Sequence, residues 1–364
     1  MTRSFKFLII AVAMAVNIDG IKPVFSVNIK TKSFEIPSFT LNTGKKIPSI
    51  GYGTYQAKNN ELEKALDIAL EAGYRHIDTA LVYENEKPIG NVLKRWFTDG
   101  KLKREDIFLV TKLPIGANRP SDVSIFLNKS LENLQVDYVD LYLIHAPFSF
   151  KRIEGNLYPK RADGSIELDN SVDHLEVWKE MEKQMNAGLT KAIGLSNFNK
   201  TQVERILKNC KTTPSSLQVE LHVYLQQNEL VDFCKKNNII MTAYSPLGSP
   251  GRGAYNRKNG KKDALPDVLG NPTVTAIAKK HSKTPAQVVL RYDIQRGIIP
   301  IPKSTNPARL KQNIDIFDFE LDEQDVRDLK ALDSGVRILD FLEFKGIENH
   351  PEYPFRSELN HHEK

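Results

Sequence analysis

Short apolar runs recur along the chain, and polar or turn-forming residues bound each of them. A run of about four to eight residues that is rich in β-branched and aromatic side chains is typical of a buried strand. Longer stretches of mixed polarity separate the runs. We predict eight strands, at 50–54, 75–80, 107–112, 139–145, 191–197, 217–222, 239–245 and 298–302.

The stretches between these runs contain amphipathic helices. In the first stretch the apolar residues recur about every three to four positions and share one face, while the charged residues lie on the other face. We predict helices at 62–72, 121–134, 172–185, 202–208 and 285–295. Strands that alternate with helices pair in parallel through right-handed crossovers, and eight of them favour a closed (β/α)8 barrel, the TIM barrel, over an open doubly wound sheet.

Further segments are expected to cover the two ends of this barrel. Residues 39–48 predict an N-terminal β-hairpin that turns around Asn42 to Gly44 and covers the barrel bottom. Insertions at 148–170 and 248–270 follow carboxyl ends of strands, which form the active-site face of such a barrel. The C-terminal segment 337–355 should form a loop over the barrel mouth, with packing against the barrel wall as the alternative. Its large apolar residues are Phe341, Leu342, Phe344, Tyr353 and Phe355.

The N-terminus has the pattern of a secretory signal peptide. Arg3 and Lys6 precede an apolar run at 7–16, which contains the small-residue pattern of Ala13 and Ala15. The run has ten residues, whereas a transmembrane helix needs about 20, so we expect no membrane span. We therefore expect a secreted protein, with the ER lumen or the cytoplasm as alternative locations and an N-terminal helix or arm as the alternative structure.

These patterns divide the chain into four parts. We expect a signal peptide at 1–20, a connecting segment at 21–36, one barrel domain at 37–356 and a tail at 357–364. Because 40% of the residues are hydrophobic and 26% are charged, the chain has enough apolar material for one large core.

Charge and cysteine content restrict the class of partner. The net charge of +6 comes from cations that are interleaved with acidic residues, so we expect no nucleic acid partner.

Cys210 and Cys234 are too few for a disulfide framework, and they either pair or stay free. Sequons at Asn128 and Asn199 predict a glycoprotein if the chain enters the secretory pathway. We expect a monomer that acts on a small molecule.

Three successive predicted strands carry an ionisable residue at or near their carboxyl ends, and a tyrosine follows the first of them. These residues are Asp78, Lys112 and His145, and the tyrosine is Tyr83. Because the carboxyl ends of parallel strands meet on one face of a barrel, we expect the four side chains to converge on one site.

Such a group of side chains suits reversible hydride transfer to a carbonyl. A tyrosine hydroxyl alone loses its proton near pH ~10, and Lys112 beside Tyr83 should lower this pKa, so that the phenol donates a proton to the developing alkoxide. Asp78 should keep the lysine charged in apolar surroundings. His145 should orient the carbonyl oxygen.

Residues 39–355 resemble the aldo-keto reductase superfamily, in which Asp, Tyr, Lys and His occupy these four positions. The resemblance implies an NADPH-dependent reductase of the aldose and aldehyde reductase type, with the cofactor extended across the carboxyl face of the barrel. Gly51 and Gly53 lack the third glycine of the dinucleotide-binding fingerprint G-x-G-x-x-G, so a Rossmann domain is disfavoured. His145 stands where steroid double-bond reductases carry glutamate, which favours carbonyl over alkene reduction.

The same resemblance assigns the cofactor site residue by residue. Ser196, Asn197 and Gln218 match residues that hold the nicotinamide carboxamide, and Tyr244 matches a tyrosine that stacks on the nicotinamide ring. Lys303 and Arg309 match cationic residues at the 2'-phosphate, and such a pair favours NADPH over NADH. The other positions are Gly53, Thr54, Tyr55 and Asp78 near the nicotinamide, Ser245, Leu247 and Ser249 at the pyrophosphate, Lys303, Ser304 and Arg309 at the 2'-phosphate, and Gln312 and Asn313 at the adenine.

The substrate is expected to meet Tyr55, Tyr83, His145 and Ala146. Tyr55 and Ala146 replace tryptophans that the aldose and aldehyde reductase branch usually carries, and Gly251 stands where relatives often carry an aspartate that clasps the cofactor loop. The small side chain of Ala146 and the apolar C-terminal segment permit a bulky hydrophobic ketone. We expect reduction of aldehydes or ketones to alcohols, with a steroid-like ketone as one substrate that the site permits and steroid metabolism as the corresponding role.

Three alternatives remain. One is a broad-specificity, aldehyde-detoxifying reductase. Another is a non-catalytic, recruited family member, against which the intact group of four residues argues. The last is a metal-dependent barrel hydrolase, which is disfavoured because His145, His174 and His222 lack paired carboxylate ligands and a nearby lysine would repel a metal ion. We therefore expect no metal.

Overall fold

The computed structural model describes residues 36–251 and 267–361. Its main sheet has eight strands, and every neighbouring pair in it is parallel. All eight predicted strands are present, although most are shorter than the apolar runs that predicted them. In sheet order they are β3 (Tyr52–Gly53), β4 (His76–Asp78), β5 (Phe108–Leu113), β6 (Leu141–Ile144), β7 (Ile193–Ser196), β8 (Ser216–Glu220), β9 (Ile240–Tyr244) and β10 (Ile298–Pro300).

Backbone hydrogen bonds join the first and last strands of this sheet. The amide of Gly51 donates to the carbonyl of Pro300 at 3.0 Å, and the amide of Gly53 donates to the carbonyl of Pro302 at 3.2 Å. A Cβ atom on Gly53 would lie 2.5 Å from the carbonyl oxygen of Ile301, so only glycine allows this close approach. The sheet is thus closed, and the predicted (β/α)8 barrel is confirmed.

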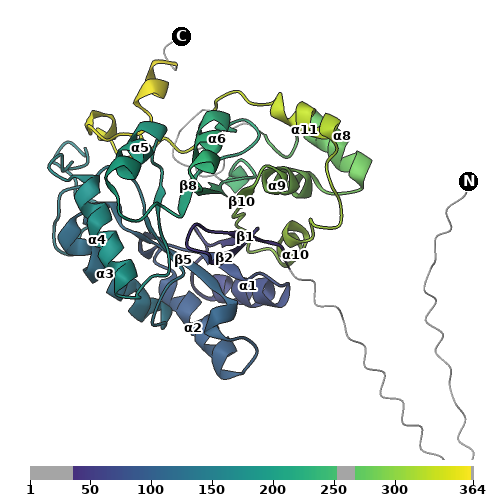
Figure 1. The fold of residues 1–364 in the computed structure, drawn as a ribbon. Helices are drawn as coiled ribbons and strands as arrows, with labels where there is room; N and C mark the ends of the chain where they lie inside the picture. The colour runs from purple at the N-terminus through teal and green to yellow at the C-terminus, as the bar shows by residue number, and fades with distance from the viewer. Residues whose placement is uncertain (1–35, 252–266, 362–364) are drawn as a thin grey trace, which may run out of the picture. The chain divides into compact units, whose positions relative to one another are not determined.

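Helices cover the outside of the barrel, and α1 to α4 pack side by side along one part of it (Figure 1). Local sequence sets their ends: α9 begins at Pro285, because Thr284 and Gln287 form a capping box around that first turn. The five predicted helices correspond to α1, α3, α4, α5 and α9. The helices are α1 (Asn59–Glu71), α2 (Glu86–Thr98), α3 (Pro120–Leu134), α4 (His174–Asn186), α5 (Lys200–Asn209), α6 (Asn228–Lys236), α8 (Pro272–His281), α9 (Pro285–Gln295), α10 (Pro307–Ile314) and α11 (Glu323–Lys330).

The predicted N-terminal hairpin consists of β1 (Ser38–Thr40) and β2 (Lys46–Pro48), which pair antiparallel. Leu41 and Ile47 from this hairpin pack into a buried cluster with Phe108 and Leu141, which lie at the amino ends of β5 and β6. The hairpin therefore covers the bottom of the barrel, as predicted.

The C-terminal segment lies over the opposite end. The backbone amides of Ile338 and Leu339 donate to the carboxylate of Glu220, at 2.7 and 2.8 Å, and Glu220 is the buried last residue of β8. Phe341 packs edge-on against Phe148 of the first insertion, with ring centroids 5.2 Å apart. The predicted loop over the barrel mouth is confirmed, and the first insertion forms part of the same cover.

Several sequence features fall outside the described residues. The expected signal peptide and, except for Ile36, the connecting segment lie there, as does most of the 248–270 insertion. Within the described ranges, no helix combines the length and apolar character that a membrane crossing requires. Of the two sequons, Asn128 is exposed on α3, whereas the side chain of Asn199 caps α5 and donates to the carbonyl of Pro354 at 3.1 Å.

We predict that Ile47→Ala lowers the free energy of unfolding by about 2–5 kcal/mol, because the fully buried side chain would leave a cavity in the cluster below the barrel. Urea denaturation measures the change. Lys45→Ala, at an exposed position in the same hairpin, should stay within about 0.5 kcal/mol of the wild type. Equal losses for the two variants would contradict the role of Ile47.

Candidate active site

A buried ion pair lies at the carboxyl ends of β4 and β5. The ammonium of Lys112 contacts Oδ1 of Asp78 at 2.6 Å and donates to the carbonyl of Thr79 at 2.8 Å. The side chains of Lys112 and Asp78 are 0% and 3% exposed. Burial lowers the pKa of Lys112, and the charge and hydrogen bond of Asp78 oppose this shift. The carboxylate is therefore what keeps an ammonium stable at this depth.

Asp78 is held from a second side. Its Oδ2 accepts a hydrogen bond from Nε2 of Gln218 in β8 at 2.6 Å, and its backbone carbonyl accepts from Oγ1 of Thr54 at 2.9 Å. Both partners are buried. Each carboxylate oxygen thus has its own donor, and the carboxylate cannot rotate without losing one of them.

Tyr83 ends the short 3-10 helix η1 (Leu81–Tyr83), which follows β4. Its hydroxyl lies 3.4 Å from Nζ of Lys112. Burial, followed by the negative charge of Asp78, raises the pKa of Tyr83 well above its usual range. From the sequence we predicted a lowered pKa for Tyr83. That prediction considered the nearby ammonium of Lys112 but not the desolvation of the phenolate. The phenol therefore stays protonated at neutral pH.

His145 directly follows β6 and faces Tyr83. The two rings meet edge-on, with centroids 5.8 Å apart. Burial, followed by the charge of Lys112, lowers the pKa of His145 well below its usual range, so the imidazole is neutral at physiological pH. Its Nδ1 has no hydrogen-bond partner among the described residues. The structure thus brings together all four residues that the sequence predicted to be catalytic.

The predicted nicotinamide residues line the neighbouring strand ends. Asn197 follows β7 with a positive φ of 63°, and its Nδ2 donates to the backbone carbonyl of His145 at 2.8 Å. The hydroxyl of Tyr244, at the end of β9, donates to Oδ1 of Asn197 at 2.7 Å. Ser196 lies 3.1 Å from the same amide. Asn197 thus links Ser196 and Tyr244 to the backbone of His145, while the side chain of Gln218 contacts Asp78.

The predicted pyrophosphate loop follows β9. Ser249 donates from its hydroxyl to the hydroxyl of Ser245 at 2.7 Å, and the amide of Gly248 donates to the carbonyl of Ser245 at 2.9 Å. Leu247, between them, is half-buried against the core. Gly251 is exposed, and a Cβ atom there would meet none of the described residues within 4 Å.

The residues predicted to bind the 2'-phosphate and adenine lie around the start of α10. Lys303 and Arg309 are exposed, and neither forms an ion pair with any residue in the described ranges. Ser304 is buried, and its hydroxyl accepts from the amide of Asn306, the N-cap of α10, at 3.1 Å. Of the two adenine positions, Gln312 is exposed and Asn313 is buried. Two unpaired cations near a helix N-terminus suit an anion.

The predicted substrate residues differ in exposure. Tyr55 is 51% exposed, and its ring lies 5.0 Å from that of Tyr83. Ala146 is 1% exposed and packs in a cluster with Ile115 and Phe148. The space beside Ala146 is thus covered by protein side chains, so its small size does not by itself widen the site, contrary to our expectation.

Sequence analysis missed Glu86, a second carboxylate near Lys112. Glu86 is the buried first residue of α2 and accepts from Oγ1 of Thr111 at 2.6 Å and from Nδ2 of Asn133 at 3.1 Å. Its charge opposes the lowering of the pKa of Lys112. In the sequence it resembles an ordinary acidic residue of a first helical turn, so only the packing identifies it.

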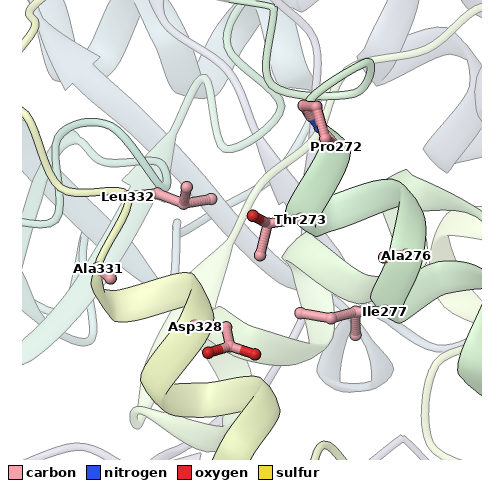
Figure 2. A pocket seen from close by; sticks show the side chains of 7 residues that line it. All are labelled: Pro272, Thr273, Ala276, Ile277, Asp328, Ala331 and Leu332. Carbon is pink, nitrogen blue, oxygen red and sulfur yellow. The ribbon is translucent and has the colours of Figure 1, made fainter.

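A separate surface cavity of about 500 Å³ lies between α8 and α11 on the outside of the barrel (Figure 2). None of the predicted site residues contributes to it. Among the described residues, no group of three or more His, Cys, Asp or Glu side chains could hold a metal ion. The cavity is lined by Pro272, Thr273, Ala276, Ile277, Asp328, Ala331 and Leu332.

A closed parallel barrel with these side chains at the carboxyl ends of its strands defines a barrel enzyme of the oxidoreductase class. The family model described as Aldo/keto reductase family matches residues 49–334, and the chain belongs to this family. It is an oxidoreductase that acts on carbonyls, and enzymes of this family use NAD(P)H.

Curated relatives match over most of their length. The chain is 43% identical to "Aldo-keto reductase family 1 member A1" of Xenopus tropicalis over 87% of this chain and 96% of that protein. It is 44% identical to "Prostaglandin F synthase 1" of Bos taurus, covering 87% and 97%, and 42% identical to "Estradiol 17 beta-dehydrogenase 5" of Mus musculus, with the same coverage. The solved aldose reductase of Schistosoma japonicum aligns with a TM-score of 0.80 at 40% identity, covering 89% of this chain and all of that one.

We predict that Lys112→Met destabilises the fold by about 3–5 kcal/mol, because it leaves the carboxylate of Asp78 buried without its partner charge. The double variant Lys112→Met/Asp78→Asn should recover much of this loss, since neither charge remains. Urea unfolding of the single and double variants gives the coupling energy. If the losses of the two single variants simply add in the double variant, the two side chains are not coupled.

Proposed function

We propose that the protein reduces aldehydes or ketones to alcohols with NADPH, and that Tyr83 is the proton donor. The observation that carries this proposal is a phenol that burial keeps protonated, 3.4 Å from a buried ammonium and edge-on to a neutral imidazole. This arrangement provides a proton source and a cation at the place where an alkoxide would develop.

Each of the four residues has a distinct task in this proposal. Tyr83 gives its hydroxyl proton to the carbonyl oxygen as that oxygen gains negative charge. The ammonium of Lys112 then stabilises the phenolate that remains, and Asp78 keeps the ammonium charged and in place. His145, being neutral, can donate a hydrogen bond that orients the carbonyl oxygen without adding a second buried cation.

The proposed cofactor is NADPH, which when bound supplies the hydride. Lys303 and Arg309 support the choice over NADH, because both are exposed and carry no competing ion pair within the described residues. The residues that would hold the cofactor are those predicted from the sequence: Gly53, Thr54, Tyr55, Asp78, Ser196, Asn197, Gln218, Tyr244, Ser245, Leu247, Ser249, Lys303, Ser304, Arg309, Gln312 and Asn313.

The proposed substrate is a bulky hydrophobic ketone, such as a steroid-like one. Aromatic rings of the first insertion and of the C-terminal segment meet above the barrel mouth, where Phe150 packs edge-on against Phe344. Two relatives carry the names prostaglandin F synthase and estradiol 17 beta-dehydrogenase, which supports a large apolar substrate. Broad aldehyde reduction is the second candidate, and the match to a solved aldose reductase favours it.

We expect Tyr83→Phe to lower turnover by about 10²-fold or more, the scale of lost general acid catalysis, and to leave NADPH binding nearly unchanged. Steady-state kinetics and a fluorescence titration with NADPH separate the two effects. Tyr138→Phe is the matched control, because Tyr138 precedes β6 at the opposite end of the barrel and packs under Arg104. Near-normal turnover of Tyr83→Phe would rule out the assignment.

Arg309→Ala should weaken NADPH binding about 10- to 100-fold, as expected for the loss of a hydrogen bond to a charged group worth about 1.5–3 kcal/mol. NADH lacks the 2'-phosphate, so its affinity should hardly change. Lys311→Ala removes another exposed cation of α10 and controls for the general change in charge. Equal weakening of NADPH and NADH by Arg309→Ala would show that this residue does not recognise the 2'-phosphate.

A further inference from the structure

Asn85 occupies the N-cap position of α2 but does not cap this helix. Asparagine is favoured at such a position because its side-chain oxygen accepts a hydrogen bond from a backbone amide of the first turn. The side chain of Asn85 makes no such bond, and the residue is 0% exposed. A buried amide group still needs partners for its two donor hydrogens and its acceptor oxygen. Its hydrogen bonds therefore lie outside the helix.

Three hydrogen bonds connect this side chain to the loops that follow β3 and β4. Its Oδ1 accepts from Oγ1 of Thr79 at 2.7 Å. Its Nδ2 donates to the carbonyl of Thr54 at 2.9 Å and to that of Ala57 at 3.1 Å. Thr79 directly follows β4, whereas Thr54 and Ala57 follow β3. The amide of Asn85 thus joins the carboxyl ends of two neighbouring strands.

The same two loops also hold the ion pair of the site. The backbone carbonyl of Thr79 accepts from Nζ of Lys112 at 2.8 Å. The amide and the hydroxyl of Thr54 both donate to the backbone carbonyl of Asp78, at 3.1 and 2.9 Å. The partners of Asn85 are therefore the residues that fix the ammonium and the backbone of its carboxylate.

The turn that carries Tyr83 depends on attachments of this kind. Glu84, between Tyr83 and Asn85, has a left-handed backbone with a φ of 56°. This conformation is unfavourable for a residue with a Cβ atom and persists only where the surrounding structure holds it. The side chain of Glu84 is 78% exposed, so the hold comes from its neighbours. Asn85 provides one attachment, and Glu86, which accepts from Thr111 in β5 at 2.6 Å, provides the other.

We propose that Asn85 is a positioning residue, which keeps the hydroxyl of Tyr83 at its place beside the ammonium of Lys112. The two groups lie 3.4 Å apart, and a displacement of about 1 Å at a reacting centre can lower a rate about 10²-fold. Because the side chain of Asn85 is buried and its donors and acceptor are engaged, it acts through Tyr83. This inference rests on the proposed carbonyl reduction and adds a residue to it.

Asn85→Ala tests the inference in assays with benzaldehyde and NADPH. We expect kcat to fall about 10- to 100-fold, because the proton donor is displaced, while KM for NADPH and for benzaldehyde hardly changes. The matched control is Gln226→Ala, which removes another fully buried amide. Nε2 of Gln226 donates to the carbonyls of Val223 and Leu329, at 2.9 and 2.8 Å, outside the proposed site. This control should lower the melting temperature without lowering kcat.

A double-mutant cycle separates positioning of the proton donor from general support of the fold. In a Tyr83→Phe background no phenolic hydroxyl remains to be positioned, so Asn85→Ala should lower kcat far less than it does in the wild type. Equal fold losses of kcat in the two backgrounds would overturn the inference and leave carbonyl reduction intact. A loss of kcat that Gln226→Ala reproduces would do the same.

Thr79→Val provides a milder test that remains available if Asn85→Ala does not fold. It removes one of the three hydrogen bonds at nearly constant volume, so kcat should fall about three- to tenfold. Thr79→Ser keeps the hydroxyl and should restore most of this loss. Equal kcat values for the valine and serine variants would contradict the inference. Absence of turnover by the wild-type protein with NADPH and every aldehyde or ketone would refute the proposed function itself, and this inference with it.

Discussion

The ion pair between Lys112 and Asp78 is the interaction on which the rest of the site depends. Taking an ammonium out of water costs several kcal/mol, and it is stable only if a well-placed carboxylate and further hydrogen bonds compensate. Three strands contribute to this arrangement: Lys112 comes from β5, its partner Asp78 from β4, and Gln218, which donates to Asp78, from β8. The pair therefore requires the closed barrel, in which β8 faces β4 across the interior.

Burial reinforces the neutral states of Tyr83 and His145. It raises the pKa of Tyr83 and lowers that of His145, and in both cases a charge of the central pair is the second contribution. The result is a neutral phenol and a neutral imidazole around one ammonium. An oxygen that gains negative charge during reduction would then meet the only formal positive charge among these residues.

The mouth of the barrel is built from parts that are distant in the sequence. Glu220 ends β8 and accepts two backbone hydrogen bonds from the C-terminal segment, which places Phe344 against Tyr158 of the first insertion. The barrel and the segment that covers its mouth are thus connected through one buried carboxylate. The C-terminal segment and the first insertion thus pack on each other above the carboxyl ends of the strands.

The sequence determined the strands and the face on which the candidate site residues meet, because short buried strands need apolar runs and the carboxyl ends of parallel strands share one face. The strand ends thus predicted that Asp78, Lys112 and His145 share one face, whereas their roles came from the chemistry of the group and the family resemblance. Only the tertiary structure decided the direction of the pKa of Tyr83, since desolvation depends on neighbours from other strands. It also decided that Ala146 is covered and that Tyr158 stacks on Phe344, because both follow from contacts between separate segments of the chain.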